Sequence, residues 1–124
     1  MHPPDHEYSS SASKRTDPWE LSGEELLAMQ ESDAPPLLLD CRTADEFNGG
    51  HLHGATCLAL QQLSLRMPDL EPHRAERIVV YCRTGRRSRI VARYLSHCGF
   101  NHVWSLASGI EGWTGPTTTD VQEH

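Results

Sequence analysis

The sequence predicts an α/β fold with a mostly parallel central sheet. Strand-like and helix-like segments alternate along the chain with short connections, the order that places helices on both faces of a parallel sheet. The strongest strand signal, residues 77–81, contains Ile-Val-Val-Tyr and is followed, after one short loop, by the strongest helix signal, residues 87–98. At 124 residues and 13.9 kDa, the chain has the length of one domain.

The apolar residues are concentrated between Trp19 and Trp113. Residues 1–17 and 115–124 consist mostly of polar, Pro, Ser, Thr and His residues, and the hydrophobic content of the whole chain is only 37%. Segments of this composition bury too little apolar surface to fold. We therefore expect a flexible polar N-terminal arm over 1–17, one folded domain over 18–114 and a flexible C-terminal tail over 115–124.

The first half of the domain predicts two helices around one buried strand. Ser22 and Thr43 each precede a glutamate by three residues, which is the capping box that begins a helix. Pro35 and Pro36 follow the first helix. Between the two helices, residues 37–41 read Leu-Leu-Leu-Asp-Cys, the continuous apolar run of a strand that is buried on both faces.

The second half predicts the remaining strands and a long helix. Residues 55–60 are predicted as a short strand, and residues 63–70 as a helical turn that Pro68 ends. Residues 102–106 are predicted as the last strand and residues 109–113 as a short closing helix. The apolar face of the helix over 87–98 is predicted to consist of Ile90, Val91, Tyr94, Leu95 and Cys98.

The composition argues against several classes of function. The formal net charge of -6 at pH 7 disfavours nucleic acid as a partner. No apolar run is long enough to span a bilayer, and the N-terminus lacks the basic start and apolar stretch of a secretion signal. We therefore expect a cytoplasmic protein without a nucleic-acid or membrane partner, and we expect its four cysteines to be free thiols.

Positive charge is concentrated beside one cysteine, Cys82. Five of the eleven Lys and Arg residues lie within residues 83–93, directly after it. Cys82 ends the strand over 77–81 and precedes a helix, which is where ligands bind in open α/β sheets. The unpaired N–H groups of a helix start attract anions and favour a thiolate, and Gly85 allows the loop to curl around one centre. The pattern predicts a reactive thiolate that receives an anionic substrate.

Four blocks of the sequence occur in an order known from one family. Residues 38–47 read apolar-apolar-Asp-x-Arg and then Glu-Phe, residues 50–55 read Gly-His-Leu-His-Gly-Ala, residues 81–88 read Tyr-Cys-Arg-Thr-Gly-Arg-Arg-Ser, and residues 108–113 read Ser-Gly-Ile-Glu-Gly-Trp. Together they resemble the single-domain rhodaneses, which are sulfurtransferases. In that family the second block usually has proline where this chain has His53, and the last block begins with glycine rather than serine.

The resemblance implies a rhodanese-like three-layer fold around a five-stranded sheet, and a persulfide relay. Cys82 would take a sulfur from thiosulfate or another persulfide donor, carry it as a persulfide, and pass it to a thiophilic acceptor. That acceptor is cyanide in vitro and a thiol or protein in vivo, and no metal or organic cofactor is implied. The cradle for the small anionic donor would be formed by Arg83, Thr84, Gly85, Arg86, Arg87 and Ser88.

Loop length separates this interpretation from the phosphatases and arsenate reductases of the same fold. Those enzymes use Cys-x5-Arg, whereas here the sixth residue after Cys82 is Ser88, and Arg87 closes a Cys-x4-Arg loop. A phosphate needs a wider cradle with an arginine at its rim, so the shorter loop favours one sulfur atom. A phosphatase or arsenate reductase and a sulfur-carrier or partner-binding module stay open as alternatives. The sequence also leaves open whether Arg86 or Arg87 faces the pocket.

Several other polar and sulfur-containing residues are interpreted as structural. Asp40 and Arg42 are predicted to form a polar network that fixes the geometry of the loop, with Glu46 as a further candidate member. His51 and His53 provide too few ligands for a tetrahedral zinc site. The remaining cysteines are predicted to be small core residues, and a second redox cysteine is the alternative: Cys41, Cys57 and Cys98.

Overall fold

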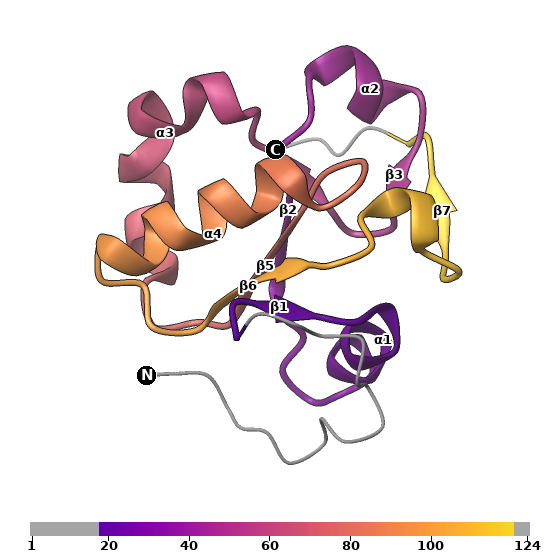
Figure 1. Cartoon of the computed structure of the whole chain (residues 1–124), viewed down its shortest axis with the longest axis horizontal. Helices are drawn as coiled ribbons and strands as arrows, with labels where there is room; N and C mark the ends of the chain where they lie inside the picture. The colour runs from indigo at the N-terminus through magenta and orange to yellow at the C-terminus, as the bar shows by residue number, and fades with distance from the viewer. Residues whose placement is uncertain (1–17, 121–124) are drawn as a thin grey trace.

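The chain forms a five-stranded sheet in which neighbouring strands are parallel (Figure 1). The computed structural model describes residues 18–120, so the predictions for residues 1–17 and for the last four residues lie outside the described part. The strand order is β1-β6-β5-β2-β4. The predicted α/β class and five-stranded sheet are confirmed. The strands are β1 (Glu20–Leu21), β2 (Leu37–Asp40), β4 (Thr56–Cys57), β5 (Ile78–Tyr81) and β6 (Val103–Leu106).

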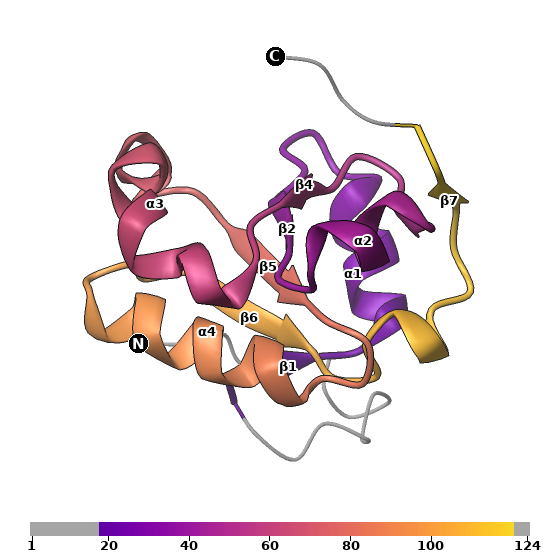
Figure 2. The same ribbon diagram turned by 90° about the horizontal axis from the view of Figure 1, so that it is seen from above.

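Helices cover both faces of the sheet and give three layers. On one face lie α3 (Leu63–Leu70) and α4 (Arg86–His97), and on the other lie α1 (Gly23–Gln30) and α2 (Ala44–Asn48) (Figure 2). None of the helices in the described part is long and apolar enough to cross a membrane.

The core is divided into two clusters because successive strand residues point to opposite faces of the sheet. Leu39 and Val80 belong to the cluster beneath α3 and α4, together with Leu95 of α4. Leu38 and Val79 belong to the cluster on the side of α1 and α2. The two central strands β2 and β5 are therefore fixed from both faces, and so are the residues that follow them.

Both predicted capping boxes are confirmed. At α1 the Glu25 N–H donates to the Ser22 hydroxyl at 3.1 Å, and the Ser22 N–H donates to the Glu25 carboxylate at 2.8 Å. At α2 the Glu46 N–H donates to the Thr43 hydroxyl at 3.2 Å, and the Thr43 N–H donates to the Glu46 carboxylate at 2.9 Å. These reciprocal bonds set the start of each helix.

A second, small sheet joins the predicted domain to residues beyond its predicted boundary at residue 114. Strand β3 (His51–Leu52) pairs in antiparallel fashion with β7 (Thr117–Thr118), with His51 opposite Thr118. The sequence analysis placed 115–124 in a C-terminal tail, and β7 lies within that segment. A two-residue Thr-Thr ladder carries no apolar pattern, so the pairing comes from tertiary contacts rather than from a local signal.

Two further elements differ from the prediction. Pro68 does not end the helical turn over 63–70 but lies inside α3, which continues to Leu70. Leu70 is buried, and its packing in the core holds the last turn despite the hydrogen bond that proline removes. The predicted strand over 55–60 is shorter, because β4 is followed by a 3-10 helix, Leu60–Gln62.

The buried face of α4 also differs from the prediction. Ile90 and Tyr94, assigned to the core by their hydrophobicity, are 60% and 41% exposed. The buried residues of this helix instead include Ser88 and Ala92, two small side chains that allow it to pack close to the sheet. Ser88 is thereby placed beside the end of β5.

Candidate active site

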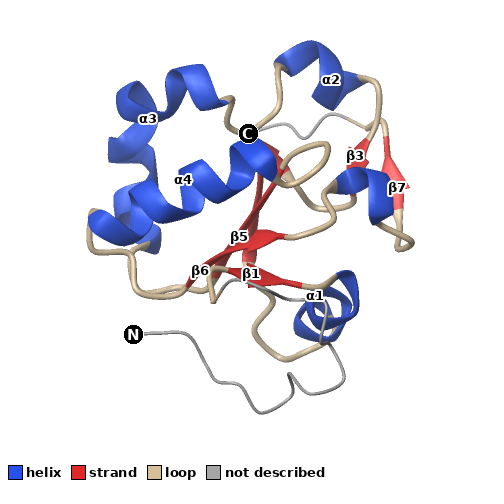
Figure 3. Ribbon diagram, in the orientation of Figure 1, coloured by secondary structure: helices blue, strands red, loops and turns tan. Residues whose placement is uncertain are grey.

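The loop between β5 and α4 carries Cys82 at the carboxyl edge of the sheet (Figure 3). Gly85 is the N-cap residue of α4 and has a φ of 99°, in the left-handed region. A Cβ at this position would lie 2.5 Å from the carbonyl oxygen of Ala107. Only glycine combines that backbone conformation with so close an approach. The turn after Cys82 therefore depends on Gly85, as the sequence predicted.

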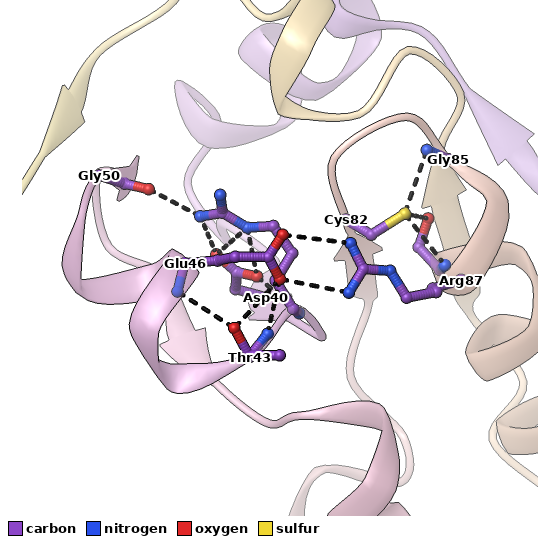
Figure 4. Close-up of polar contacts among 9 residues, drawn as sticks. Asp40, Thr43, Glu46, Gly50, Cys82, Gly85 and Arg87 are labelled. Carbon is purple, nitrogen blue, oxygen red and sulfur yellow. Dashed lines mark hydrogen bonds and ion pairs between the residues drawn. The ribbon is translucent and has the colours of Figure 1, made fainter.

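The Cys82 sulfur lies among hydrogen-bond donors from the start of α4 (Figure 4). The Gly85 and Ser88 N–H groups donate to Sγ at 3.1 and 3.4 Å. The Ser88 hydroxyl lies 3.5 Å from the same sulfur and 2.7 Å from the hydroxyl of Ser105 on β6. Donation from Ser105 to Ser88 leaves the Ser88 hydrogen for the sulfur. Ser105 is fully buried and completes a chain of polar groups that the sequence analysis missed.

The thiol of Cys82 is unusually acidic. Its pKa falls to about 4 from an ordinary 9.0, first because the Cys41 thiol donates a hydrogen bond to it, while burial opposes the fall and Ser88 and Gly85 add to it. The same hydrogen bond raises the pKa of Cys41, which stays protonated as the donor. At neutral pH the pair therefore consists of a thiolate at Cys82 and a thiol at Cys41.

Cys41 is buried as predicted, but its contact with Cys82 was not predicted. Asp40 and Tyr81 are register partners in the parallel pair of β2 and β5, so the next residues, Cys41 and Cys82, are neighbours as well. The sequence signal was that each of two strands is followed directly by a cysteine. It could be used only once the two strands were known to be adjacent and in this register.

The structure distinguishes the two central arginines. Arg87 is half-buried, and its guanidinium contacts the Glu46 carboxylate at 3.3 and 3.5 Å (Figure 4). Hydrogen bonds from the Thr43 backbone and from Arg87 lower the pKa of Glu46 to about 2. The pKa of Arg87 is raised, first by Glu46 and also by the charge of Cys82. Arg86 is exposed. Arg87 is thus the arginine on the side of the sulfur.

The outer part of the loop is held by the chain that follows β6. The Ile110 N–H donates to the Cys82 carbonyl at 2.9 Å, and the Glu111 N–H donates to the Arg83 carbonyl at 3.1 Å. These donors belong to the 3-10 helix Ile110–Gly112, which replaces the predicted closing helix over 109–113. Arg83 and Thr84 are exposed, so their side chains stand at the rim.

Asp40 and Arg42 form a buried ion pair, as predicted. Arg42 Nη2 lies 2.7 Å from Asp40 Oδ2, and the same nitrogen donates to the Gly50 carbonyl at 2.7 Å. The Tyr81 hydroxyl accepts the Leu52 N–H at 2.9 Å, and its pKa is raised first by burial and then by the charge of Asp40. The network thus fixes the end of β5 and the segment around Gly50. Direct contact with the 82–88 loop comes from Glu46 instead.

His51 is fully buried and makes structural contacts. Its Nδ1 donates to the Phe47 carbonyl at 2.8 Å, and its ring stacks on the Phe47 ring with centroids 3.7 Å apart. Within residues 18–120 there is no group of three or more His, Cys, Asp or Glu side chains that could hold a metal ion.

An acidic cysteine between a central parallel strand and the start of a helix places this chain among the α/β proteins with a cysteine loop at the carboxyl edge of the sheet. Within that class, this chain belongs to the rhodanese-like domain family, whose pattern matches residues 22–116. The match covers β2, β4, β5 and β6 of the five-stranded sheet, all but β1, and the 82–88 loop.

Similar proteins extend this assignment. A sulfurtransferase of Allochromatium vinosum is 32% identical over 94 residues, which is 76% of this chain and 86% of that protein. YrkF of Bacillus subtilis, named as a candidate sulfur carrier, is 31% identical over 98 residues, and the chain spans only 52% of its length. A rhodanese-like domain protein of Staphylococcus aureus has the same fold, with a TM-score of 0.70 at 21% identity, over 77% of this chain and 90% of that one.

Proposed function

We propose that this protein is a sulfurtransferase that moves a sulfane sulfur from thiosulfate, or another persulfide donor, to a thiophilic acceptor. The carrier is a persulfide on Cys82. The observation behind the proposal is the acidic thiol, whose pKa of about 4 makes it a thiolate at neutral pH. The thiolate is the form of cysteine that attacks sulfur. The name of the Allochromatium vinosum relative supports the same chemistry.

The first half-reaction loads the sulfur. Cys82 Sγ attacks the outer sulfur of thiosulfate, the sulfur–sulfur bond of the donor breaks, and sulfite leaves with the electron pair. The product is a persulfide whose negative charge rests on the outer sulfur. The Gly85 and Ser88 N–H groups, now 3.1 and 3.4 Å from Sγ, are the nearest donors for that charge.

The second half-reaction unloads the sulfur. The acceptor attacks the outer sulfur, the bond to Sγ breaks, and Cys82 leaves as a thiolate. Its low pKa makes it a good leaving group as well as a nucleophile that is present at neutral pH. Cyanide would give thiocyanate, and a thiol or protein acceptor would give a new persulfide. Two half-reactions on one sulfur predict ping-pong kinetics.

The remaining residues of the predicted site have supporting roles in this proposal. The exposed side chains of Arg83 and Arg86 attract an anionic donor, and Thr84 lines the rim. Arg87 meets the donor on the side of the sulfur, and Asp40 with Arg42 holds the strand that presents Cys82. No metal or organic cofactor takes part in either step. We also propose a cytoplasmic location, which four free cysteines within the described residues favour.

A second candidate function is that of a sulfur carrier loaded by another protein. The similarity to YrkF favours it, because that protein is named for sulfur carriage. A carrier would use the same thiolate but would take its sulfur from a protein persulfide rather than from thiosulfate. The two functions therefore differ in donor.

The test is the mass of the intact protein, with sulfite release, after brief incubation with thiosulfate. We expect one equivalent of sulfite and a gain of about 32 Da in wild type, reversed by cyanide. Cys82→Ser should show neither, and Cys98→Ser, altered at the far end of α4, should behave as wild type. Loading by a protein persulfide alone would favour the carrier. Turnover of an aryl phosphate with no sulfur gain would identify a phosphatase instead.

A further inference from the structure

Cys41 is the neighbour of Cys82 on the adjacent strand, and the two residues share one face of the sheet. The Cys41 N–H donates to the Tyr81 carbonyl at 3.0 Å, which continues the β2–β5 ladder by one residue. Both side chains belong to the cluster beneath α3 and α4, and each is 1% exposed. The two thiols also influence each other, because Cys82 raises the pKa of Cys41 and Cys41 lowers the pKa of Cys82.

This placement is compatible with a disulfide. Neighbouring strands lie about 4.8 Å apart, and disulfides join cysteines whose Cα atoms are about 4.4–6.8 Å apart. The pair can close without a large backbone movement. The other described cysteines are placed differently: Cys57 packs against the cluster on the opposite face of the sheet, and Cys98 lies at the far end of α4.

We propose that Cys41 is a resolving cysteine, which discharges the Cys82 persulfide as sulfide and leaves a Cys41–Cys82 disulfide. The Cys41 sulfur attacks Cys82 Sγ, the bond between Sγ and the outer sulfur breaks, and the outer sulfur leaves with the electron pair and the Cys41 proton as hydrosulfide. No external oxidant is needed, because the sulfane sulfur is itself reduced. A dithiol reductant then restores both thiols. The inference rests on the proposed sulfurtransferase function.

The contacts of the two cysteines favour attack on Sγ rather than on the outer sulfur. Cys41 approaches Sγ from β2, whereas the Gly85 and Ser88 N–H groups approach it from α4. The N–H groups offer a site for the outer sulfur, so Cys41 is left facing Sγ. Attack along the line of the breaking bond is the geometry that thiol–disulfide exchange requires.

The loading step itself prepares Cys41. In the resting protein the hydrogen bond to the Cys82 thiolate, burial and the charge of that thiolate raise the pKa of Cys41 and keep it inert. In the persulfide the negative charge moves one atom away, to the outer sulfur. The hydrogen bond and the charge that keep Cys41 protonated then weaken. At the same time Cys82 Sγ, the atom that Cys41 attacks, becomes electrophilic. Cys41 therefore becomes reactive only after a sulfur has been loaded.

The experiment is a single turnover with thiosulfate and no added acceptor, in which sulfite, sulfide and intact mass are followed over time. In wild type we expect the mass to rise by about 32 Da and then to fall to about 2 Da below the reduced protein, with one equivalent of sulfide. Cys41→Ser should keep its persulfide and release no sulfide. Sulfite release reports how much sulfur each protein has loaded, so sulfide is counted per equivalent of sulfite released. Cys98→Ser should follow wild type.

A second arm tests the pair without sulfane sulfur. One equivalent of hydrogen peroxide converts the Cys82 thiolate to a sulfenic acid, and a Cys41 in reach expels water to give the same disulfide. A disulfide in wild type and none in Cys41→Ser supports the pairing. A wild-type persulfide that stays intact, or equal sulfide release from Cys41→Ser, overturns the resolving role alone. Failure of both proteins to load sulfur from any donor overturns the proposed function and this inference with it.

Discussion

The acidity of Cys82 depends most on one neighbour, and Cys41→Val tests that dependence. The variant removes the hydrogen-bond donor that comes first among the causes of the low pKa, but it keeps an apolar side chain in a buried position. A hydrogen bond to a charged group contributes about 1.5–3 kcal/mol, and about 1.4 kcal/mol corresponds to one pH unit. Cys41→Val should therefore raise the pKa of Cys82 from about 4 by about one to two pH units.

The assay is the rate of iodoacetamide alkylation at Cys82 as a function of pH, measured by mass spectrometry on the peptide that contains this residue. Cys41→Ser keeps a donor and should titrate close to wild type, and Cys57→Val is the control for a cysteine on the opposite face. All proteins should reach the same plateau at high pH, where the thiol is ionised in each. The hydrogen bond would not set the pKa of Cys82 if this pKa were the same in Cys41→Val as in wild type. The same conclusion would follow if Cys41→Ser had the raised pKa of Cys41→Val.

Three further predictions test the loop, the network and the charge. Gly85→Ala should lower the free energy of unfolding by about 1–3 kcal/mol and abolish sulfur loading. The reason is that the φ of 99° and the nearby Ala107 carbonyl leave no room for a Cβ. Urea unfolding measures the first effect and intact mass the second. Asp40→Ala leaves the Arg42 charge buried without its partner and should cost about 3–5 kcal/mol in urea unfolding, whereas a loss near zero would refute the network. The pKa of Cys82 is lowered on folding, so its ionisation stabilises the protein fully above pH 9.0 and this contribution disappears as the pH falls to about 4. The difference in unfolding free energy between wild type and Cys82→Ser should shrink across that range, and an unchanged difference would refute the low pKa.

Local signals predicted the elements that carry the site. The β-branched run of β5, the two capping boxes and the Gly85 turn each depend on residues that are close in sequence, and each was predicted at nearly its observed position. Propensity and capping act over a few residues, so one sequence is enough to detect them. The placement of Cys82 after β5 follows from these elements.

Contacts between distant segments were not predictable in the same way. Ser105 reaches Ser88 because β6 lies beside β5, and Cys41 reaches Cys82 because β2 lies on the other side. Neither the strand order nor the register is encoded in any one segment. The exposure of Ile90 has a similar origin, since the face of α4 that is buried is decided by which side packs on the sheet rather than by hydrophobicity alone.

The structure also changes the physical explanation of the thiolate. The sequence analysis attributed the acidity of Cys82 to the N–H groups at the helix start and to the arginines nearby. Gly85 and Ser88, at that helix start, do lower the pKa, but the first cause is Cys41, and the chief causes are hydrogen bonds rather than the charges of the arginines. Short contacts inside a buried pocket act at full strength, whereas charges on exposed side chains are screened by water.

The arginines of the loop form ion pairs with carboxylates, and their proposed role is to bind the anionic donor. Arg87 contacts Glu46 and Arg83 contacts Glu111, each at 3.3 Å, so part of their charge is already balanced. An anionic donor would be attracted to these arginines at the rim of the loop. There it can displace the half-buried or exposed carboxylates of Glu46 and Glu111 from them. Activation of the sulfur and capture of the donor are therefore carried by different residues. A change in Arg83 should alter donor affinity and leave the acidity of Cys82 intact, which separates the two contributions to the same reaction.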